Sequence, residues 1–280
     1  MTTAAVSASA PIPRARGGML RTIYIVWWRD VIRFWRDRAR LVASFAQPLL
    51  YLVIFGSGLS SALGGGFAAA GGVSYTQFIY PGVISMSVLF SAIFGGMSIV
   101  WDREFGFMKE LLVAPIERTA VAIGKTLGSA TQSLVQAVIL LLLAPFVGVT
   151  FTVTSFFELL GLMIVLAFGL SAFGVAIASR MKSMQGFQVV MNFLMMPMFF
   201  LSGALFPLVG LPLWMTVLTR LDPASYGIDP IRRTVLGAPA ERTAITLGDQ
   251  IVPIGLEALI VFAFGLVMLA FAARAFQHRD

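Results

Sequence analysis

The chain has 280 residues, of which 58% are hydrophobic and only 12% are charged. A soluble domain carries about a quarter charged residues, so this composition excludes an ordinary soluble protein and indicates an integral membrane protein. The net charge of +7 does not indicate binding to nucleic acid, because the chain lacks the exposed polar surface that a basic patch needs. The absence of cysteine excludes disulfides and thiolate metal sites, and His278, the single histidine, leaves little room for histidine-based metal or catalytic sites.

Long stretches without Asp, Glu, Lys or Arg predict six membrane-spanning helices. The first of these stretches covers residues 41–101, and further ones follow along the chain. A helix needs about 20 apolar residues to cross the hydrocarbon core, which places the spans at residues 41–59, 78–100, 120–147, 157–179, 187–206 and 251–273. We therefore expect an all-α integral membrane fold, with six transmembrane helices in residues 41–273 preceded by an amphipathic interfacial helix.

The distribution of basic residues predicts the orientation. An even number of spans puts both termini on one side, and most lysines and arginines are then cytoplasmic if that side is inside. We expect a multi-pass protein of the cytoplasmic membrane with both termini in the cytoplasm. Residues 1–18 are predicted to be a disordered tail rather than a signal peptide, and residues 274–280 a short tail. The uncharged, Gly/Ala-rich stretch 60–74 is predicted to be a flexible outer loop.

Residues 19–40 predict an amphipathic elbow helix at the membrane surface. Leu20, Tyr24, Trp27, Val31 and Phe34 share one face of the helical wheel, and arginines share the opposite face. Aromatic side chains of such a helix lie in the headgroup layer, and its arginines reach lipid phosphate. The residues expected at the membrane interface are Trp27, Trp28, Arg29, Arg33, Trp35 and Arg36. The helix is either a plain anchor or also a contact for a cytosolic partner.

The next inner segment, residues 101–125, is predicted to hold a short amphipathic helix. Asp102 would cap this helix and Pro115 would end it. Such a helix suits docking into a groove on another protein, whereas an ordinary solvated loop is the alternative. Its surface charges are Glu104, Lys109 and Glu110.

The triplet Gly124-Lys125-Thr126 resembles the end of a phosphate-binding P-loop. The full motif needs a glycine where Thr119 stands, and it must follow a strand, whereas this triplet opens an apolar helix. We therefore expect no nucleotide or other cofactor on this chain and no enzymatic activity of its own.

The fifth predicted span is rich in methionine. Met191, Met195 and Met198 share one face of a helix. Methionine is an adaptable side chain that fills gaps in helix packing and also occurs at surfaces that bind varied apolar partners. These residues are therefore candidates either for helix packing or for contact with a bulky hydrophobic substrate.

The outer segment 207–250 is predicted to hold two short helices. Asp222 and Asp229 are each followed by proline, which is the pattern of an N-cap and first helical position. Gly237 marks a stop, and residues 213–218 are expected to dip into the membrane interface.

Glu257 lies in the sixth predicted span. A carboxylate inside a membrane is costly, so it is a candidate for a role in transport or gating. Because Glu257 lies near the outer end of its span, it could instead snorkel to the surface or pair with Arg232 or Arg233.

Two motifs resemble a known family. The block D-R-E-x-G-x-M-K-E-x-L-x-x-P from Asp102 to Pro115 resembles the coupling segment of type-2 ABC exporter permeases, especially the daunorubicin-resistance-like branch. The stretch F-L-S-G-x-x-F-P from Phe200 to Pro207 resembles the signature that follows the fifth span in that family. The layout of six spans behind an amphipathic helix is also similar, so the resemblance extends over nearly the whole chain beyond residue 19.

The resemblance implies a permease subunit of an ATP-driven exporter for a drug or lipid, or less readily a polysaccharide. Two permease subunits, as a homodimer or with a paralogue, would pair in the lipid bilayer above two ABC ATPase subunits that carry ATP and Mg²⁺. The outer helices of residues 207–237 would form a lid. The residues implied in coupling are Asp102, Arg103, Glu104, Gly106, Lys109, Glu110 and Pro115, with a second contact at Arg180 and Lys182.

An ion-coupled secondary transporter is the main alternative. Such a transporter favours several intramembrane acids and an inverted repeat, but Glu257 is the one deep acid and the two halves show no convincing repeat. A membrane-embedded enzyme would need clustered Asp, Glu or His, and the acids here are scattered. A purely structural component is a third possibility. The substrate, the choice between homodimer and heterodimer, and the direction of transport beyond the family resemblance stay open.

Overall fold

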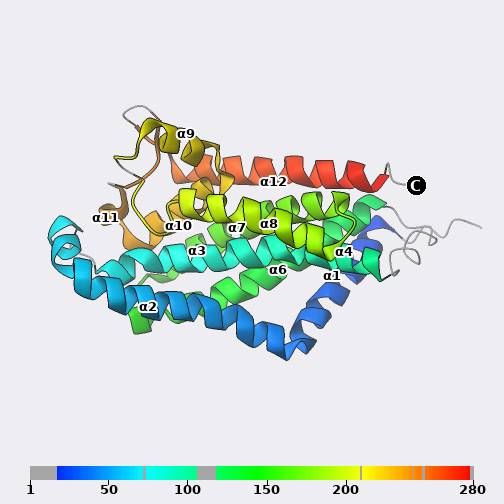
Figure 1. Cartoon of the computed structure of the whole chain (residues 1–280), viewed down its shortest axis with the longest axis horizontal. Helices are drawn as coiled ribbons and strands as arrows, with labels where there is room; N and C mark the ends of the chain where they lie inside the picture. Colours follow the sequence, from blue (N-terminus) through cyan, green and yellow to red (C-terminus); the bar gives the residue numbers. More distant parts are fainter. Residues whose placement is uncertain are drawn as a thin grey trace, which may run out of the picture.

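The computed structural model describes residues 18–71, 74–105, 118–208, 210–241, 243–247 and 250–277. In these ranges the chain is predominantly helical, and the long helices run side by side as one bundle (Figure 1). The expected all-α fold is confirmed.

In the part of the chain that the structure describes, seven long helices form the bundle, and short elements connect them. The long helices are α1 (Met19–Arg36), α2 (Arg38–Gly71), α3 (Tyr75–Gly95), α6 (Arg118–Leu142), α7 (Val153–Arg180), α8 (Met184–Leu201) and α12 (Ile254–Gln277). The short elements are α4 (Met97–Glu104), the 3-10 turn η1 (Ala144–Val147), α9 (Leu213–Leu221), α10 (Pro223–Leu236), α11 (Ala238–Glu241) and the antiparallel pair β1 (Thr246–Leu247) and β2 (Gln250–Ile251).

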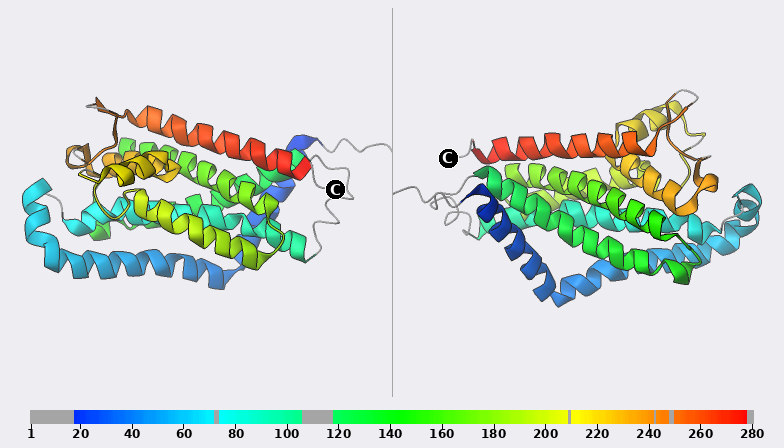
Figure 2. Two further views of the ribbon diagram at one scale, coloured as in Figure 1. Left: turned by 45° about the horizontal axis from the view of Figure 1, so that its top comes forward. Right: turned by 180° about the vertical axis from the view of Figure 1, so that it is seen from behind.

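Helix α7 occupies the centre of the bundle. It packs against α3, α6, α10 and α12, and its side chains Leu159, Met163 and Leu170 are at most 1% exposed. Helix α2 lies along α3, and α1 crosses α6 (Figures 1 and 2). Because lipid is as apolar as leucine, such helices associate through close packing and polar contacts rather than through the hydrophobic effect.

Four helical stretches in the described chain are long and apolar enough to cross a membrane. They are Tyr75–Glu104, Val153–Arg180, Met184–Leu201 and Ile254–Gln277. A fifth is reached if α1 and Leu41–Gly56, which meet at 71°, form one bent span. The fold is therefore that of a multi-pass membrane protein. The count of six stays a prediction, because α6 carries a lysine and several polar side chains and is not among these stretches.

Three predicted boundaries are wrong. Helix α2 continues to Gly71, through most of the loop predicted at residues 60–74, and no proline interrupts it beyond Pro48. Helix α8 ends at Leu201 instead of residue 206, since Gly203 adopts φ +75 directly after its C-cap and so ends the helix. The second predicted span continues beyond residue 100, as α4, to Glu104.

The two predicted N-caps in the outer segment have different outcomes. Asp222 caps α10, and its side chain accepts a hydrogen bond from the Ala224 N–H. Asp229 does not begin a second helix, because α10 runs unbroken past it and Pro230 to Gly237, where φ is +65. The carboxylate of Asp229 instead accepts from the N–H of Ile245 at 3.1 Å.

Both ends of the described chain lie together. The N-terminal end of α1 and the C-terminal end of α12 occupy one end of the bundle, which we call the proximal end (Figures 1 and 2). There, Arg118 of α6 donates hydrogen bonds to the carbonyl oxygens of Phe276 and Gln277 at 3.2 and 3.1 Å. Helices α9, α10 and α11 gather at the opposite end, the distal end.

Candidate coupling site and its buried charges

A lysine and two carboxylates are buried together at the proximal end. The Lys125 Nζ atom on α6 lies 2.8 Å from Asp102 Oδ2 on α4 and 3.1 Å from Asp30 Oδ1 on α1. A third bond, of 3.1 Å, reaches Ser98 Oγ. These contacts use the three donors of an ammonium group. All three charged residues are at most 3% exposed, so they hold three helices together.

Two arginines complete this group from its surface. Arg29 Nη2 lies 2.6 Å from Asp102 Oδ2, and Arg33 Nη1 lies 3.5 Å from Asp102 Oδ1. Both arginine side chains are nearly half exposed, and the Arg33 guanidinium lies 5.5 Å from the centre of the Trp101 ring. We call Asp30, Asp102, Lys125, Arg29 and Arg33 the charge cluster. With three cations for two carboxylates, it leaves no buried acid unpaired.

Small residues on α6 allow α1 to approach closely enough for these bonds. A Cβ atom added at Gly124 would lie 2.8 Å from Val26 Cβ, and one at Gly128 would lie 3.0 Å from Asp30 Cβ. Glycines one turn apart are a common device for close helix crossing in membranes. The triplet Gly124-Lys125-Thr126 therefore has a structural use: its glycine admits α1, and its lysine binds the two carboxylates.

The predicted apolar face of α1 is divided between the surface and the bundle. Leu20 and Tyr24 are 81% and 56% exposed, whereas Val31 and Phe34 are buried together with Val26 and Asp30. The amphipathic pattern did not indicate that Asp30, a polar residue neutralised by Lys125, is buried on this helix.

The residues predicted at the membrane interface have two kinds of environment. Trp28 and Trp35 are about half exposed, as aromatic residues facing lipid headgroups would be, and Arg36 is also exposed. Trp27 instead donates from Nε1 to Thr131 Oγ1 on α6 at 3.0 Å. Arg29 and Arg33, which were expected to reach lipid phosphate, bind Asp102 within the protein.

The predicted coupling segment begins differently from expectation. Asp102 does not cap a docking helix: it lies inside α4, and its carboxylate turns inward to Lys125. Arg103 donates to the carbonyl oxygens of Ser179, at 3.1 Å, and Met181. Glu104 Oε2 accepts from the N–H of Met184 at 2.9 Å.

These bonds join the base of the coupling segment to the turn between α7 and α8. Arg180 is the last residue of α7 and Lys182 lies in that turn, so the second predicted contact lies beside Arg103 and Glu104, the described start of the first. Arg180 also lies over the ring of Phe271 on α12 at 4.7 Å. Gly106, Lys109, Glu110 and Pro115 lie outside the described residues, and the docking helix stays a prediction.

Two of the three candidate methionines of α8 lie in the protein core. Met191 and Met195 are fully buried, and Met198 is partly buried. The opposite face of α8 is exposed, with Val189, Phe193 and Met196 at 65%, 78% and 53%. Within the described part of a single chain, Met191 and Met195 serve helix packing.

Glu257 is fully buried at the distal end and binds Arg233, so it does not snorkel. Arg233 Nε also lies 3.2 Å from Asp229 Oδ2, and its Nη1 donates to the carbonyl oxygen of Val252 at 2.9 Å. The neighbouring Arg232 binds the carbonyl oxygens of Gly203 and Ala204. These bonds join α10 to α12 and to the F-L-S-G turn that ends α8.

At the start of α10, burial changes the titration of the capping carboxylate. Burial raises the pKa of Asp222 to about 7, although the hydrogen bonds from the Ala224 N–H and the Ser225 hydroxyl act to lower it. Among the described residues, no group of three or more His, Cys, Asp or Glu side chains could hold a metal ion.

Sequence reasoning missed two members of the charge cluster, Asp30 and Lys125. Lys125 stood five residues inside a predicted span, and an intramembrane charge is a signal in itself. Asp30 lies on α1, which the sequence analysis interpreted from its arginines and aromatic residues. Only the crossing of α1 over α6 shows that Asp30 and Lys125 meet.

The family model for the ABC-2 type transporter matches residues 21–236. The chain belongs to the ABC-2 type transporter family. The predicted family is thereby confirmed, and the protein is a membrane permease of an ABC transporter. The matched region begins within α1 and ends with α10, so it includes the whole charge cluster. The daunorubicin-resistance-like branch stays a prediction.

Several curated proteins are similar to this ABC-2 permease. A protein of Pyropia yezoensis called ycf38, whose name describes it as a transport permease, is 31% identical over 219 residues, or 76% of this chain and 74% of its own. The inner membrane transport permease YadH of Escherichia coli strain K12 is 28% identical over 229 residues, 81% and 88% of the two chains. Nodulation protein J of Rhizobium leguminosarum bv. viciae is 25% identical over 229 residues, 80% and 86%.

Proposed function

We propose that this ABC-2 permease is the transmembrane subunit of an exporter powered by separate ATP-binding subunits, which carry the ATP and Mg²⁺. The charge cluster is the observation that carries the proposal. It ties the amphipathic helix α1 and the base of the coupling segment to α6, in the part of the chain where a cytosolic motor would act.

The bonds around α4 suggest how movement would be transmitted. Force on residues 106–117 would reach α4, which Asp102 joins to α1 and α6. The same force would reach the turn between α7 and α8 through Arg103 and Glu104. Buried ion pairs and backbone hydrogen bonds resist separation, so these helices would move as a unit. This arrangement requires the proximal end to face the cytoplasm, which the excess of basic residues favours.

Reversal of the charge at Glu104 tests the coupling. Glu104→Lys removes the acceptor of the Met184 N–H and places a cation beside Arg103 and Lys182, so we expect transport per ATP hydrolysed to fall about tenfold, equivalent to a coupling energy of about 1.4 kcal/mol. The measurement is ATP hydrolysis and substrate uptake into proteoliposomes that contain the permease and its ATPase.

Two variants serve as controls for that experiment. Glu104→Gln keeps the acceptor oxygen and should retain most coupling, and Glu241→Lys makes the same charge change at the exposed α11, at the distal end. Normal coupling in the E104K variant, with the protein folded and bound to its ATPase, would contradict the proposed docking region.

The proposed substrate is hydrophobic or amphipathic, a drug or lipid more readily than a polysaccharide. The exposed helix faces support this, because that of α12 is apolar except for Arg274 and Gln277 near its end, and that of α8 places Val189, Phe193 and Met196 beside only a few uncharged polar side chains. Compounds of these classes should stimulate ATP hydrolysis by the complex, and stimulation confined to charged sugars would contradict the assignment.

An ion-coupled transporter is less well supported by the site. Its candidate acid, Glu257, is held by Arg233, and an acid that must exchange ions during transport is poorly served by a fixed cationic partner. Transport driven by an ion gradient in liposomes without the ATPase would favour this alternative.

A further inference from the structure

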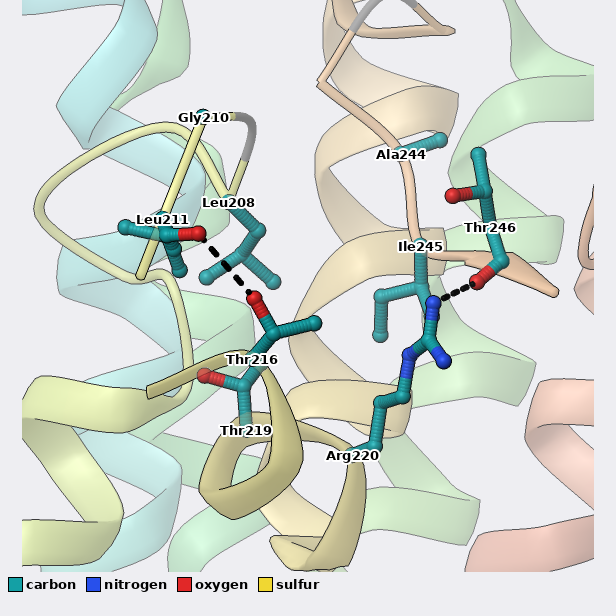
Figure 3. A pocket seen from close by; sticks show the side chains of 9 residues that line it. All are labelled: Leu208, Gly210, Leu211, Thr216, Thr219, Arg220, Ala244, Ile245 and Thr246. Carbon is teal, nitrogen blue, oxygen red and sulfur yellow. Dashed lines mark hydrogen bonds between the residues drawn. The ribbon is translucent and has the colours of Figure 1, made fainter. Parts of the chain in front are cut away.

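A pocket at the distal end is not used by the proposed coupling mechanism. Its volume is about 340 Å³, and it lies between α9, the turn before α9 and the segment that leads into β1 (Figure 3). Leu208 and Leu211 form one side, and Ala244 and Ile245 form the other. The pocket is therefore apolar on two sides.

Helix α9 contributes polar groups to this pocket. Thr216, Thr219 and Arg220 line it, and Figure 3 shows Arg220 extended toward the segment that holds Thr246. Arg220 Nη2 donates to the Thr246 carbonyl oxygen at 2.9 Å, which holds the guanidinium against that wall. Thr219 is only 4% exposed, and its hydroxyl has no hydrogen-bond partner among the described residues.

The charge of the pocket favours an anion. No carboxylate is among its lining residues in the described chain, so Arg220 gives it a net positive charge. The Tyr226 hydroxyl donates to the Arg220 carbonyl oxygen at 2.9 Å and fixes the backbone at this position. Guanidinium groups bind phosphate oxygens through charge-assisted hydrogen bonds, and a hydroxyl buried without a partner is stabilised when an acceptor reaches it.

The same helix presents an apolar surface beside Arg220. Leu213 is 81% exposed and Val217 is 49% exposed. At about 100° per residue, Leu213 lies roughly 20° and Val217 roughly 60° from Arg220 around the helix. A ligand whose headgroup binds Arg220 could therefore lay an apolar tail on these side chains without leaving α9.

We propose that this pocket binds the phosphate headgroup of an anionic amphiphile, whose tail lies along the exposed apolar side of α9. The proposal goes beyond export and does not depend on it, because binding is measured on the full-length permease alone. Absence of lipid binding would leave the result of the coupling experiment unaffected, and absence of coupling would leave the result of the lipid-binding experiment unaffected.

The test measures thermal unfolding of the full chain in a neutral maltoside detergent as dioctanoyl-phosphatidylglycerol is added. We expect a saturable rise in Tm for the wild type and for Arg38→Gln, which removes an exposed arginine far from the pocket. Arg220→Gln should weaken the apparent affinity about tenfold or more, the usual cost of losing a charged hydrogen bond. Dioctanoyl-phosphatidylcholine, a neutral lipid with the same tails, should give a smaller rise.

Three outcomes would overturn the proposal. The first is an equal response of the wild type and the R220Q variant to the anionic lipid. The second is an equal response of the wild type to both lipids. The third is a saturable rise with inorganic phosphate that matches the lipid, which would identify a site for a free anion. Arg220→Lys, which keeps the charge but not the guanidinium, should show intermediate affinity and keeps the test valid if R220Q folds poorly.

Discussion

Lys125 is the residue that joins the two carboxylates of the charge cluster. It is 1% exposed and lies between carboxylates from α1 and α4. Taking charges out of water is costly, and a buried ion pair stabilises a fold little in net terms, yet removing one partner leaves the other uncompensated. The contribution of Lys125 is therefore to specify which three helices meet and in what register.

Replacement of Lys125 by methionine should destabilise the fold by about 3 kcal/mol, because Asp30 and Asp102 would remain buried with only the partly exposed Arg29 and Arg33 to compensate them. The free energy of unfolding in mixed micelles would measure this. The double variant Lys125→Met with Asp30→Asn should recover part of the loss. Lys182→Met, at an exposed lysine, is the control, and a K125M variant as stable as this control would contradict the role of the cluster.

At the scale of the elements, the crossing of α1 and α6 shows how a helix expected to lie on the membrane becomes part of the bundle. Its bonds to α6 include Lys125 with Asp30, Trp27 with Thr131, and Gln132 with the Asp30 carbonyl oxygen at 3.2 Å. Glycines on α6 make these bonds possible by letting the two backbones approach. Helix α1 is therefore positioned by polar contacts, while its exposed tryptophans, Trp28 and Trp35, remain free to contact lipid headgroups.

A bulky side chain at this crossing should separate the two helices. We expect Gly124→Leu to destabilise the protein by about 1–3 kcal/mol, because its Cβ would lie 2.8 Å from Val26 Cβ. Gly161→Leu on α7 is the matched control, since no atom lies within 4 Å of an added Cβ there. Thermal unfolding and proteolysis within α1 would compare the two, and similar behaviour of both variants would show that close approach of α1 is not required.

At the scale of the whole molecule, the helices divide into a buried set and an exposed set. In the most apolar 18-residue stretch of each helix, 72% is buried for Tyr75–Glu104 and 61% for Val153–Arg180. The corresponding shares for α8 and α12 are only 22% and 17%. The exposed apolar faces must contact either lipid or another subunit. The proposed second permease requires one such face, and the outward side of α8 is our candidate for it.

Because the chain contains no cysteine, single-cysteine variants can test directly whether two permeases pair through the outward side of α8. We expect Phe193→Cys, at a site 78% exposed on α8, to form disulfide-linked dimers in native membranes after mild oxidation. Phe262→Cys, 42% exposed on α12, should remain monomeric. Equal cross-linking at both positions, or none at Phe193→Cys, would argue against pairing through α8. The measurement is the fraction of dimer on a non-reducing gel.

The local signals in the sequence were sufficient to identify the chain as a membrane protein and to locate most of its helices. Runs without charge are unambiguous because lipid excludes charged side chains and unpaired backbone groups. The Asp222 cap and the stop at Gly237 follow from backbone chemistry alone. The motifs of residues 102–115 and 200–207 were sufficient for the family, since such motifs report ancestry rather than packing.

Only the tertiary structure decided which charges meet and which faces are buried. Asp30 and Lys125 are 95 residues apart, and nothing local to either indicates the other. Asp102 carries the signs of a helix cap in sequence but turns inward, because a lysine from another helix lies beneath it. The physical reason is the same in each case: a long-range ion pair in a low-dielectric interior outweighs the local preference of a side chain, and its partner becomes known only once the helices are packed.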